Sequence, residues 1–282
     1  MALVTAVGLT VGAAGTAAGL AGEDAPGAGA PNADAVAARA AAGKPKITLP
    51  KVKWKRTWSD EFNGRGRPTA KWRAAIGNGK KGWTHRALQY YRWENASLTG
   101  KGQLVISANK EPRSTKLKCW YGPCKYTSAR LQTNGKFAQR YGRFAIRAKL
   151  PTGQGMWPAF WMQRSAPYGE IDVIETIGKY PKLAQGWAHD GRKRRGGGKL
   201  QMRQPLSAGF HTYGVDWTPW RIVWWVDGKP YAQMKRYKGW PFDKAHYLIL
   251  SLQVGGNWPG SPSAKTRFPQ RMQVDWVRAY RA

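Results

Sequence analysis

The 282-residue sequence contains few acidic residues, few cysteines and few histidines. Only 15 Asp and Glu residues stand against 47 Lys and Arg, which gives a formal net charge of +32, and there are two Cys and four His. With so few Cys and His residues, a structural zinc site lacks ligands. No long segment keeps a helical period of apolar residues, and no internal repeat is present, so the sequence favours neither a helical bundle nor a repeat protein.

The first 43 residues are mostly Ala and Gly and have almost no large apolar side chain after Leu20. Such a segment cannot bury enough apolar surface to offset the entropy of folding. Its opening resembles the apolar region of a secretory signal, although no Lys or Arg precedes Arg39, and it is too weakly hydrophobic for a membrane span. The predicted organisation is a truncated signal segment at residues 1–20, a disordered linker at 21–50 and a folded domain at 51–282. We therefore expect a secreted protein without a membrane span.

Short β-rich runs alternate with turn residues from Lys44 onward, as a β-sandwich requires. The clearest strands are residues 104–108, 143–148, 221–226 and 247–252. Asp227 and Gly228 follow one of these runs and form a hairpin signal. All-β sandwiches often reach roughly 200–250 residues as one domain. The sequence therefore predicts an all-β domain of two packed antiparallel sheets.

The most informative stretch is residues 168–175, Tyr-Gly-Glu-Ile-Asp-Val-Ile-Glu, which holds three of the fifteen acids. On a strand, Glu170 and Asp172 share one face, whereas Glu175 lies at an odd offset and would point to the other face. A bulge of one extra residue between Asp172 and Glu175 puts all three on the same side. Clustering scarce acids costs mutual repulsion, which favours a functional site over a strand whose acids merely face water.

The spacing of the two glutamates indicates a reaction type. With the bulge they lie four strand steps apart, about 13 Å between Cα atoms. Two Glu side chains that lean toward each other bring the carboxyl groups to about 5 Å, the separation of a retaining glycosidase rather than the ~6.5–9.5 Å of an inverting one. A calcium site is the weaker alternative, since one strand rarely supplies enough converging oxygens. The stretch therefore predicts the catalytic acids of a glycoside hydrolase.

The same strand resembles the active-site signature of glycoside hydrolase family 16. It has the bulged E-x-D-x-x-E form of laminarinases, agarases and carrageenases rather than the unbulged E-x-D-x-E form of lichenases and xyloglucan transglycosylases. Further segments match in the order of that family: residues 58–62, 88–91, 126–130, 141–144, 155–162, 210–213, 226–228, 255–260 and 274–278. The resemblance covers about residues 54–281. It implies a jelly-roll catalytic domain whose concave sheet forms a carbohydrate cleft.

The resemblance also implies roles for individual residues. Glu170 is the nucleophile that forms a covalent glycosyl-enzyme, and Glu175 is the general acid and then the base. Asp172 assists by holding Glu170 through a hydrogen bond and by raising the proton affinity of its neighbours. The implied substrate-binding residues are Trp157, Trp161, His189, Asn257 and Trp258. For His189, a structural role is an equal alternative.

No cofactor is expected for catalysis. The resemblance implies a structural Ca²⁺ that Asp275 binds together with backbone carbonyls near residues 58–61. Cys119 and Cys124 enclose a Trp-Tyr-Gly-Pro turn, so in an oxidising compartment we expect one disulfide between them. Because the loop is so short, its stabilising effect should be modest.

Two segments depart from the family pattern. Residues 83–87, Trp-Thr-His-Arg-Ala, stand where laminarinase-like members usually have Gly-Asn-Asn-Glu before Leu-Gln-Tyr-Tyr, so sugar contacts cannot be transferred there. Residues 192–195 are four consecutive cations next to the expected cleft, after the segment in which many members have a His-Gly-Pro turn.

The basic charge attracts polyanions of any kind. It leaves open an anionic substrate, adsorption to an anionic polymer or cell wall, or a merely solvated surface, and no nucleic-acid motif accompanies it. We predict a secreted, monomeric, endo-acting retaining β-glycosidase whose polysaccharide substrate is β-1,3-glucan of the laminarin type. The alternatives are a hydrolase of an anionic galactan of the agar or carrageenan type, and a non-catalytic cationic protein that binds polysaccharide or polyanion.

Overall fold

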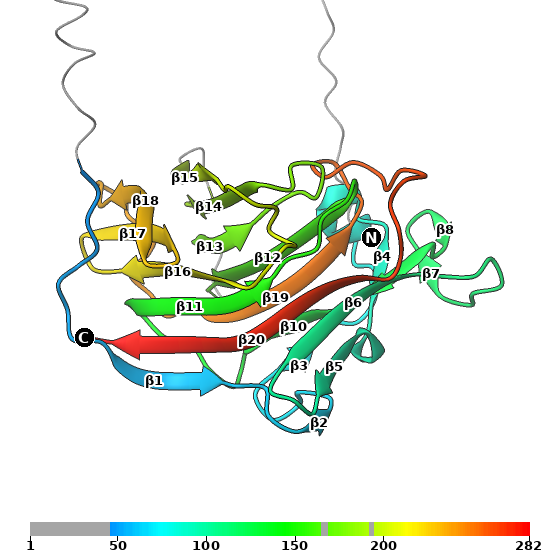
Figure 1. Cartoon of the computed structure of the whole chain (residues 1–282), viewed down its shortest axis with the longest axis horizontal. Coiled ribbons are helices and arrows are strands. Elements are labelled where there is room, and N and C mark those ends of the chain that lie inside the picture. Colours follow the sequence, from blue (N-terminus) through cyan, green and yellow to red (C-terminus); the bar gives the residue numbers. More distant parts are fainter. Residues whose placement is uncertain (1–45, 165–168, 192–194) are drawn as a thin grey trace, which may run out of the picture. The chain divides into compact units, whose positions relative to one another are not determined.

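The computed structural model describes residues 46–164, 169–191 and 195–282, and its compact folded unit spans Ile47–Ala282 (Figure 1). The predicted signal segment and most of the predicted linker lie outside the described residues. Within the described part of the chain, no helix is long and apolar enough to cross a membrane.

The folded unit is built from two β-sheets, as predicted. The larger sheet has eleven strands: β1 (Lys55–Asp60), β2 (Arg65–Gly66), β4 (Gln89–Tyr91), β5 (Ala96–Thr99), β6 (Leu104–Lys110), β9 (Tyr126–Ser128), β11 (Gly142–Lys149), β16 (His211–Trp217), β17 (Arg221–Val226), β18 (Lys229–Lys235) and β20 (Gln270–Arg281). Its main path is β18-β17-β16-β11-β20-β6-β5-β2, with β1 paired to β20. Long neighbouring strands are antiparallel, and the short pair β4–β9 is parallel.

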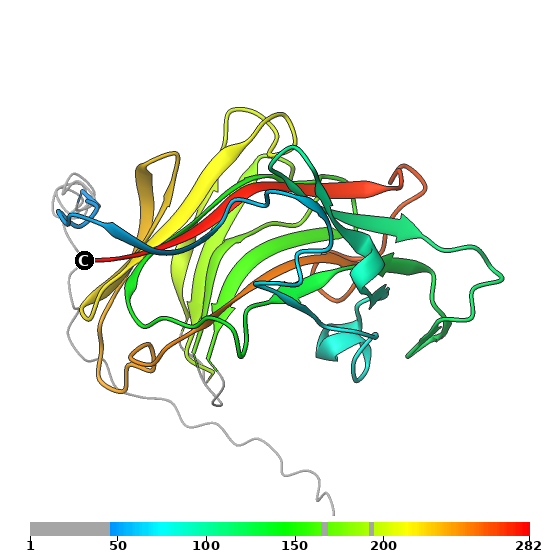
Figure 2. The same ribbon diagram turned by 90° about the horizontal axis from the view of Figure 1, so that it is seen from below.

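The second sheet has seven strands in the order β15-β14-β13-β12-β19-β10-β3. They are β3 (Arg73–Ala74), β10 (Arg130–Gln132), β12 (Met156–Gln163), β13 (Glu170–Glu175), β14 (Leu183–His189), β15 (Arg195–Gln201) and β19 (Tyr247–Val254). The remaining elements are a small hairpin, β7 (Lys118–Cys119) with β8 (Gly122–Pro123), and two short helical turns, η1 (Gly82–Arg86) and η2 (Trp93–Asn95). Figure 2 shows the curvature of both sheets, with the red β20 in one and the orange β19 in the other.

The four strands predicted from the sequence correspond to β6, β11, β17 and β19. The hairpin signal is also confirmed, because Asp227 and Gly228 join β17 to β18. Both residues have positive φ angles, 47° and 76°, which is the conformation of the type I′ turn that suits the twist of a two-residue hairpin.

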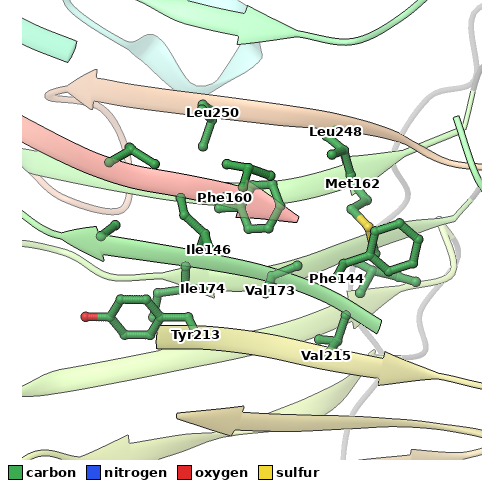
Figure 3. Close-up of a cluster of buried hydrophobic side chains, with 14 of the residues drawn as sticks. Phe144, Ile146, Phe160, Met162, Val173, Ile174, Tyr213, Val215, Leu248 and Leu250 are labelled. Atoms are coloured by element: carbon green, nitrogen blue, oxygen red, sulfur yellow. The ribbon is translucent and has the colours of Figure 1, made fainter. Parts of the chain in front are cut away.

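The hydrophobic core lies between the two sheets (Figure 3). Its members in that view include Phe144 and Ile146 of β11, Tyr213 and Val215 of β16, Phe160 and Met162 of β12, Val173 and Ile174 of β13, and Leu248 and Leu250 of β19. Because alternate residues of a strand point to opposite faces, burying Phe160 and Met162 turns Trp157 and Trp161 to the outer face of the seven-stranded sheet. The core thereby positions the aromatic side chains of the site described next.

Candidate active site

A cleft of about 820 Å³ lies on the outer face of the seven-stranded sheet. Side chains from β10, β12, β13, β14, β15 and β19 line it, together with residues from η1, β4 and the loop after β19. The three acids Glu170, Asp172 and Glu175 all line this cleft. The structure therefore brings together the acids that the sequence pattern singled out.

The predicted bulge in β13 is confirmed. On β12, Trp161 pairs with Asp172 and the adjacent Phe160 pairs with Ile174, which leaves Val173 as the extra residue. The register with β14 shifts over the same stretch. The bulge lets both Val173 and Ile174 point into the core while Asp172 and Glu175 face the cleft.

Glu175 is buried, and Trp157 on the neighbouring β12 donates a hydrogen bond to its carboxyl group. The indole Nε1 of Trp157 donates a hydrogen bond of 3.0 Å to Oε2 of Glu175. Burial raises the pKa of Glu175 well above its ordinary value, and the negative charges of Asp172 and Glu170 raise it further. The hydrogen bond from Trp157 and the positive charge of His189 oppose this rise. Glu175 is therefore the acid of the cleft that is suited to hold a proton.

Glu170 has a different environment. Burial raises the pKa of Glu170 as well and the net shift is upward, but the positive charges of His189 and Arg130 oppose this rise, because they stabilise the carboxylate form. Two carboxyl groups whose surroundings differ in this way can divide acid and nucleophile roles between them.

His189 lies beside the acids, where it could act on them. Its Nε2 is 3.2 Å from Oδ2 of Asp172, and on the neighbouring strands it pairs with Glu170. In the described parts of the chain, Glu170, Asp172 and His189 are also the one group of three side chains that could share a metal ion, with ligand atoms within 4.8 Å of one another. These three side chains therefore offer oxygen and nitrogen ligands to a cation.

One end of the cleft is aromatic. The rings of Trp157 and Trp258 meet edge to face with centroids 4.8 Å apart, and His85 lies 5.7 Å from Trp157. The guanidinium group of Arg130 lies between two rings, 4.8 Å from the centroid of Trp161 and 5.1 Å from that of Trp83. We call this region, with Trp83, His85, Trp157 and Trp258, the aromatic end.

The other end of the cleft is polar. On adjacent strands, Glu175 pairs with Gln185, and Gln185 pairs with Lys199, so a row of three lining side chains crosses β13, β14 and β15. We call the region of Gln185 and Lys199 the polar end. The acids lie between the two ends, as cleavage inside a bound chain would require.

The sequence analysis did not name ten of the lining residues as site residues, and Trp83, His85, Arg130, Gln185 and Lys199 are among these ten. Arg130 ends one of the segments that carried the family resemblance, and Gln185 has the same strand parity as His189, so the sequence could have indicated both as lining residues. Trp83 and His85 lie in the segment that departs from the family pattern. Lys199 had no signal, because its place depends on the register of β15 on β14.

Two further expectations concern Asn257 and the cationic run at 192–195. Asn257 is exposed beside the cleft, where its backbone N–H donates a 2.8 Å hydrogen bond to the carbonyl of His85. The cationic run at 192–195 falls outside the described residues, except for the backbone of Arg195 at the start of β15.

The expected disulfide is present between Cys119 and Cys124, whose Cα atoms are 5.0 Å apart. The carboxylate of Asp275 forms an ion pair with Arg147 on the neighbouring β11. The pairing of β1 with β20 places the backbone of Ser59 and Asp60 beside the residues that follow Asp275. The backbone of the predicted calcium site is therefore near. A Ca²⁺ ion at Asp275 would share the carboxylate with Arg147, and this ion stays a prediction.

Comparison with known proteins identifies the family. Residues 87–278 match the profile of Glycosyl hydrolases family 16. A beta-glucanase of Rhodothermus marinus is 39% identical over 258 residues, which cover 81% of this chain and 85% of that protein. A glucan endo-1,3-beta-glucosidase A1 of Niallia circulans is 34% identical over 259 residues, covering 79% of this chain but only 37% of that longer protein.

The fold of a solved relative is also similar. The laminarinase catalytic domain from Thermotoga maritima MSB8 superposes with a TM-score of 0.75 at 37% identity, over 82% of this chain and 99% of that one. The two-sheet architecture, the acidic strand and these matches agree with one another. The chain therefore belongs to family 16 of the glycosyl hydrolases.

Proposed function

We propose that this chain is a secreted, monomeric, endo-acting β-glycosidase that hydrolyses β-1,3-glucan of the laminarin type with retention of configuration. The observation that carries the proposal is the pair of acids, Glu170 and Glu175, which the bulge in β13 turns into one cleft, and of the two Glu175 has the pKa that is raised further. The names of the relatives, a beta-glucanase and a glucan endo-1,3-beta-glucosidase, support the choice of glucan.

The reaction proceeds in two displacements. In the first, the carboxylate of Glu170 attacks the anomeric carbon while Glu175 gives its proton to the leaving glycosidic oxygen, so the C–O bond breaks and a glycosyl ester forms. In the second, Glu175 takes a proton from a water molecule, which attacks the anomeric carbon and releases Glu170. Asp172, whose Oδ2 lies 3.2 Å from Nε2 of His189, raises the pKa of Glu175 through its negative charge and so favours the protonated form of that acid.

The rest of the cleft serves the polysaccharide. Trp157, Trp161 and Trp258 offer ring faces and edges on which the apolar faces of sugars pack, and the hydrogen bond from Trp161 Nε1 to Ser251 Oγ at 3.3 Å fixes one of these rings. A cleft that runs from an aromatic end to a polar end, with the acids between, suits cleavage inside a long chain.

A second candidate substrate is an anionic galactan of the agar or carrageenan type. It is favoured by two cations that line the cleft, Arg130 and Lys199, and by the net charge of +32. A sulfate or carboxylate on the substrate would gain a charge-assisted interaction with such groups.

A screen of reducing-sugar release from laminarin, lichenan, agarose, carrageenan and hyaluronan tests these proposals. We expect the highest rate on laminarin, with oligosaccharides of mixed length as early products. The variants Glu170→Gln and Glu175→Gln, checked for folding by circular dichroism, should each have an activity roughly 10²- to 10⁴-fold below that of the parent. An NMR time course in which the inverted anomer appears first would refute retention, and a maximal rate on carrageenan would favour the second candidate.

We also propose that the basic surface adsorbs the enzyme to anionic polymers or cell walls. Screening acts over a Debye length of about 10 Å at 0.1 M salt, so such adsorption should weaken as ionic strength rises. Replacing residues 192–195 with Ser should reduce retention on a sulfated polymer at low salt while laminarin turnover stays unchanged. Equal retention of variant and parent would remove that run from the proposal.

A further inference from the structure

The short turn η1 has an unusual backbone. Lys81, Trp83, Thr84 and Arg86 have φ angles of 45°, 57°, 67° and 57°, and none of them is Gly or Asn, the residues that tolerate this left-handed region best. Such a conformation costs energy at each residue and persists only where the surroundings enforce it. The neighbours of η1 must therefore hold it.

This turn supplies a wall of the substrate cleft. Trp83 and His85 line the aromatic end, and the ring of Trp83 contacts both the guanidinium of Arg130 and, at 5.9 Å between centroids, the ring of Tyr91. The cleft face of η1 thus presents an indole and an imidazole to any chain that occupies this end.

The loop closed by the disulfide, residues 119–124, packs against η1 and the residues that follow it. Trp120 donates from Nε1 to the carbonyl of Ala87 at 3.0 Å, and Tyr121 donates from its hydroxyl to the carbonyl of Leu88 at 2.5 Å. Ala87 and Leu88 directly follow η1. Both of the loop's aromatic side chains therefore fix the exit of the turn.

Further contacts reinforce the same interface. The buried Asn78, which precedes η1, accepts a hydrogen bond from the backbone N–H of Trp120 at 3.0 Å and donates to the carbonyl of Ala87 at 3.2 Å. The guanidinium of Arg86 lies 5.1 Å from the centroid of the Trp120 ring. A Cβ atom on Gly82 would come 2.5 Å from the backbone N and O of Ala87 and 2.8 Å from the Trp120 indole nitrogen, so only glycine allows these close approaches.

We propose that the disulfide-closed loop, residues 119–124, is a positioning element of the substrate cleft that holds the strained turn η1 through Trp120 and Tyr121, and so fixes Trp83 and His85 at the aromatic end. The substrate of this cleft is the polysaccharide of the proposed function, so the positioning role rests on that function. Trp120 and Tyr121 are positioning residues, because they act on the substrate through η1.

A kinetic comparison tests the positioning role. The variants Trp120→Ala and Cys119→Ser with Cys124→Ser should raise KM for laminarin by roughly two- to tenfold, since each loses hydrogen bonds or the closure that orients them. The value of kcat and the pH profile should stay as in the parent, because the acids lie on β13 and keep their contacts. Trp120→Phe keeps a ring for Arg86 but loses the bond to Ala87, so it should fall between Trp120→Ala and the parent.

The matched control is Trp220→Ala. Trp220 is 73% exposed in the turn between β16 and β17, outside the cleft, so its removal should leave KM unchanged. An unchanged KM in both Trp120→Ala and the double serine variant would overturn the proposal. A loss of kcat with a shifted pH profile would overturn it as well, since the loop would then act on the acids.

Limited trypsin digestion tests the positioning role without a measurement of enzyme activity. Lys80, Lys81 and Arg86 are exposed cleavage sites in or beside η1, and Lys101 in the turn between β5 and β6 is a reference site. In the Trp120→Ala and double serine variants, mass spectrometry should find faster cleavage at the first three sites and an unchanged rate at Lys101. If trypsin cleaves the variants and the parent at equal rates at the three sites in or beside η1, the positioning role is overturned. If the parent fails to hydrolyse laminarin but the variants open at η1, the proposed function is wrong and the positioning role stands.

Discussion

The indole Nε1 of Trp157 donates a hydrogen bond of 3.0 Å to the carboxyl oxygen Oε2 of Glu175, and this bond opposes the effect of burial on the pKa of Glu175. A donor favours the ionised carboxylate, whereas burial and the charge of Asp172 favour the protonated acid. The balance between these effects sets the pH at which Glu175 can still give a proton to a leaving group.

Substitution of Trp157 by Phe should shift that balance. The variant loses the donor, so the pKa of Glu175 rises further, the acid stays protonated to higher pH, and the alkaline limb of kcat/KM moves upward. Trp161→Phe is the matched control, because its Nε1 donates to Ser251 and not to a carboxyl group. An alkaline limb that moves equally in both variants, or in neither, would contradict this assignment of the general acid.

His189 should affect the acidic limb. Its positive charge lowers the pKa of Glu170, so His189→Asn should raise that pKa, and Glu170 will then be protonated and inactive at pH values at which the parent still works. The acidic limb of kcat/KM is therefore expected to move upward. His211→Asn serves as the control, since His211 pairs with Asp227 at the β17–β18 hairpin, outside the cleft. If the two variants have the same acidic limb as the parent, His189 has only a structural role.

The acidic strand could be predicted because its geometry is local. Strand parity alone shows that Glu170 and Glu175 need one extra residue between them, and the register on β12 identifies Val173 as that residue. The hairpin at Asp227 and Gly228 was predictable for the same reason, since a two-residue turn is encoded by the residues that form it.

Trp157 and Trp258 of the aromatic end were predicted, but the rest of the two ends of the cleft could not be, because distant contacts determine it. Trp83 and His85 reach the cleft from a left-handed turn whose support comes from Trp120, 33 residues from its hydrogen-bond partner Ala87. Lys199 lines the cleft only through the register of β15 on β14, and a slip by one residue would turn its side chain to the other face. Neither arrangement follows from a local pattern.

Deletion of Val173 tests whether the bulge matters only for the direction of the acids. The shortened strand reads Glu-Ile-Asp-Ile-Glu, in which strict alternation puts all three acids on one face, and the pairing with β12 then continues without a gap. We expect hydrolysis well above that of Glu175→Gln, with a stability loss of about 1.5–3 kcal/mol because a buried valine is removed. Val173→Ala, which keeps the bulge, is the control for lost packing. A folded deletion variant as inactive as Glu175→Gln would show that the bulge does more than turn the acids.

Asp275 and Arg147 provide a test of the predicted calcium ion, because the two residues share an ion pair between β20 and β11. If Asp275 also binds Ca²⁺ with nearby backbone carbonyls, EDTA should lower the melting temperature and excess Ca²⁺ should restore it. At a hundredfold excess over Kd, the ion would add roughly 2.7 kcal/mol to the free energy of unfolding. Asp275→Asn should abolish this response. Arg147→Gln removes only a partly exposed ion pair, worth about 0.2–1 kcal/mol, so it should keep the response to calcium. A parent protein whose melting temperature changes neither with EDTA nor with added Ca²⁺ has no such ion, and Asp275 then acts through Arg147 alone.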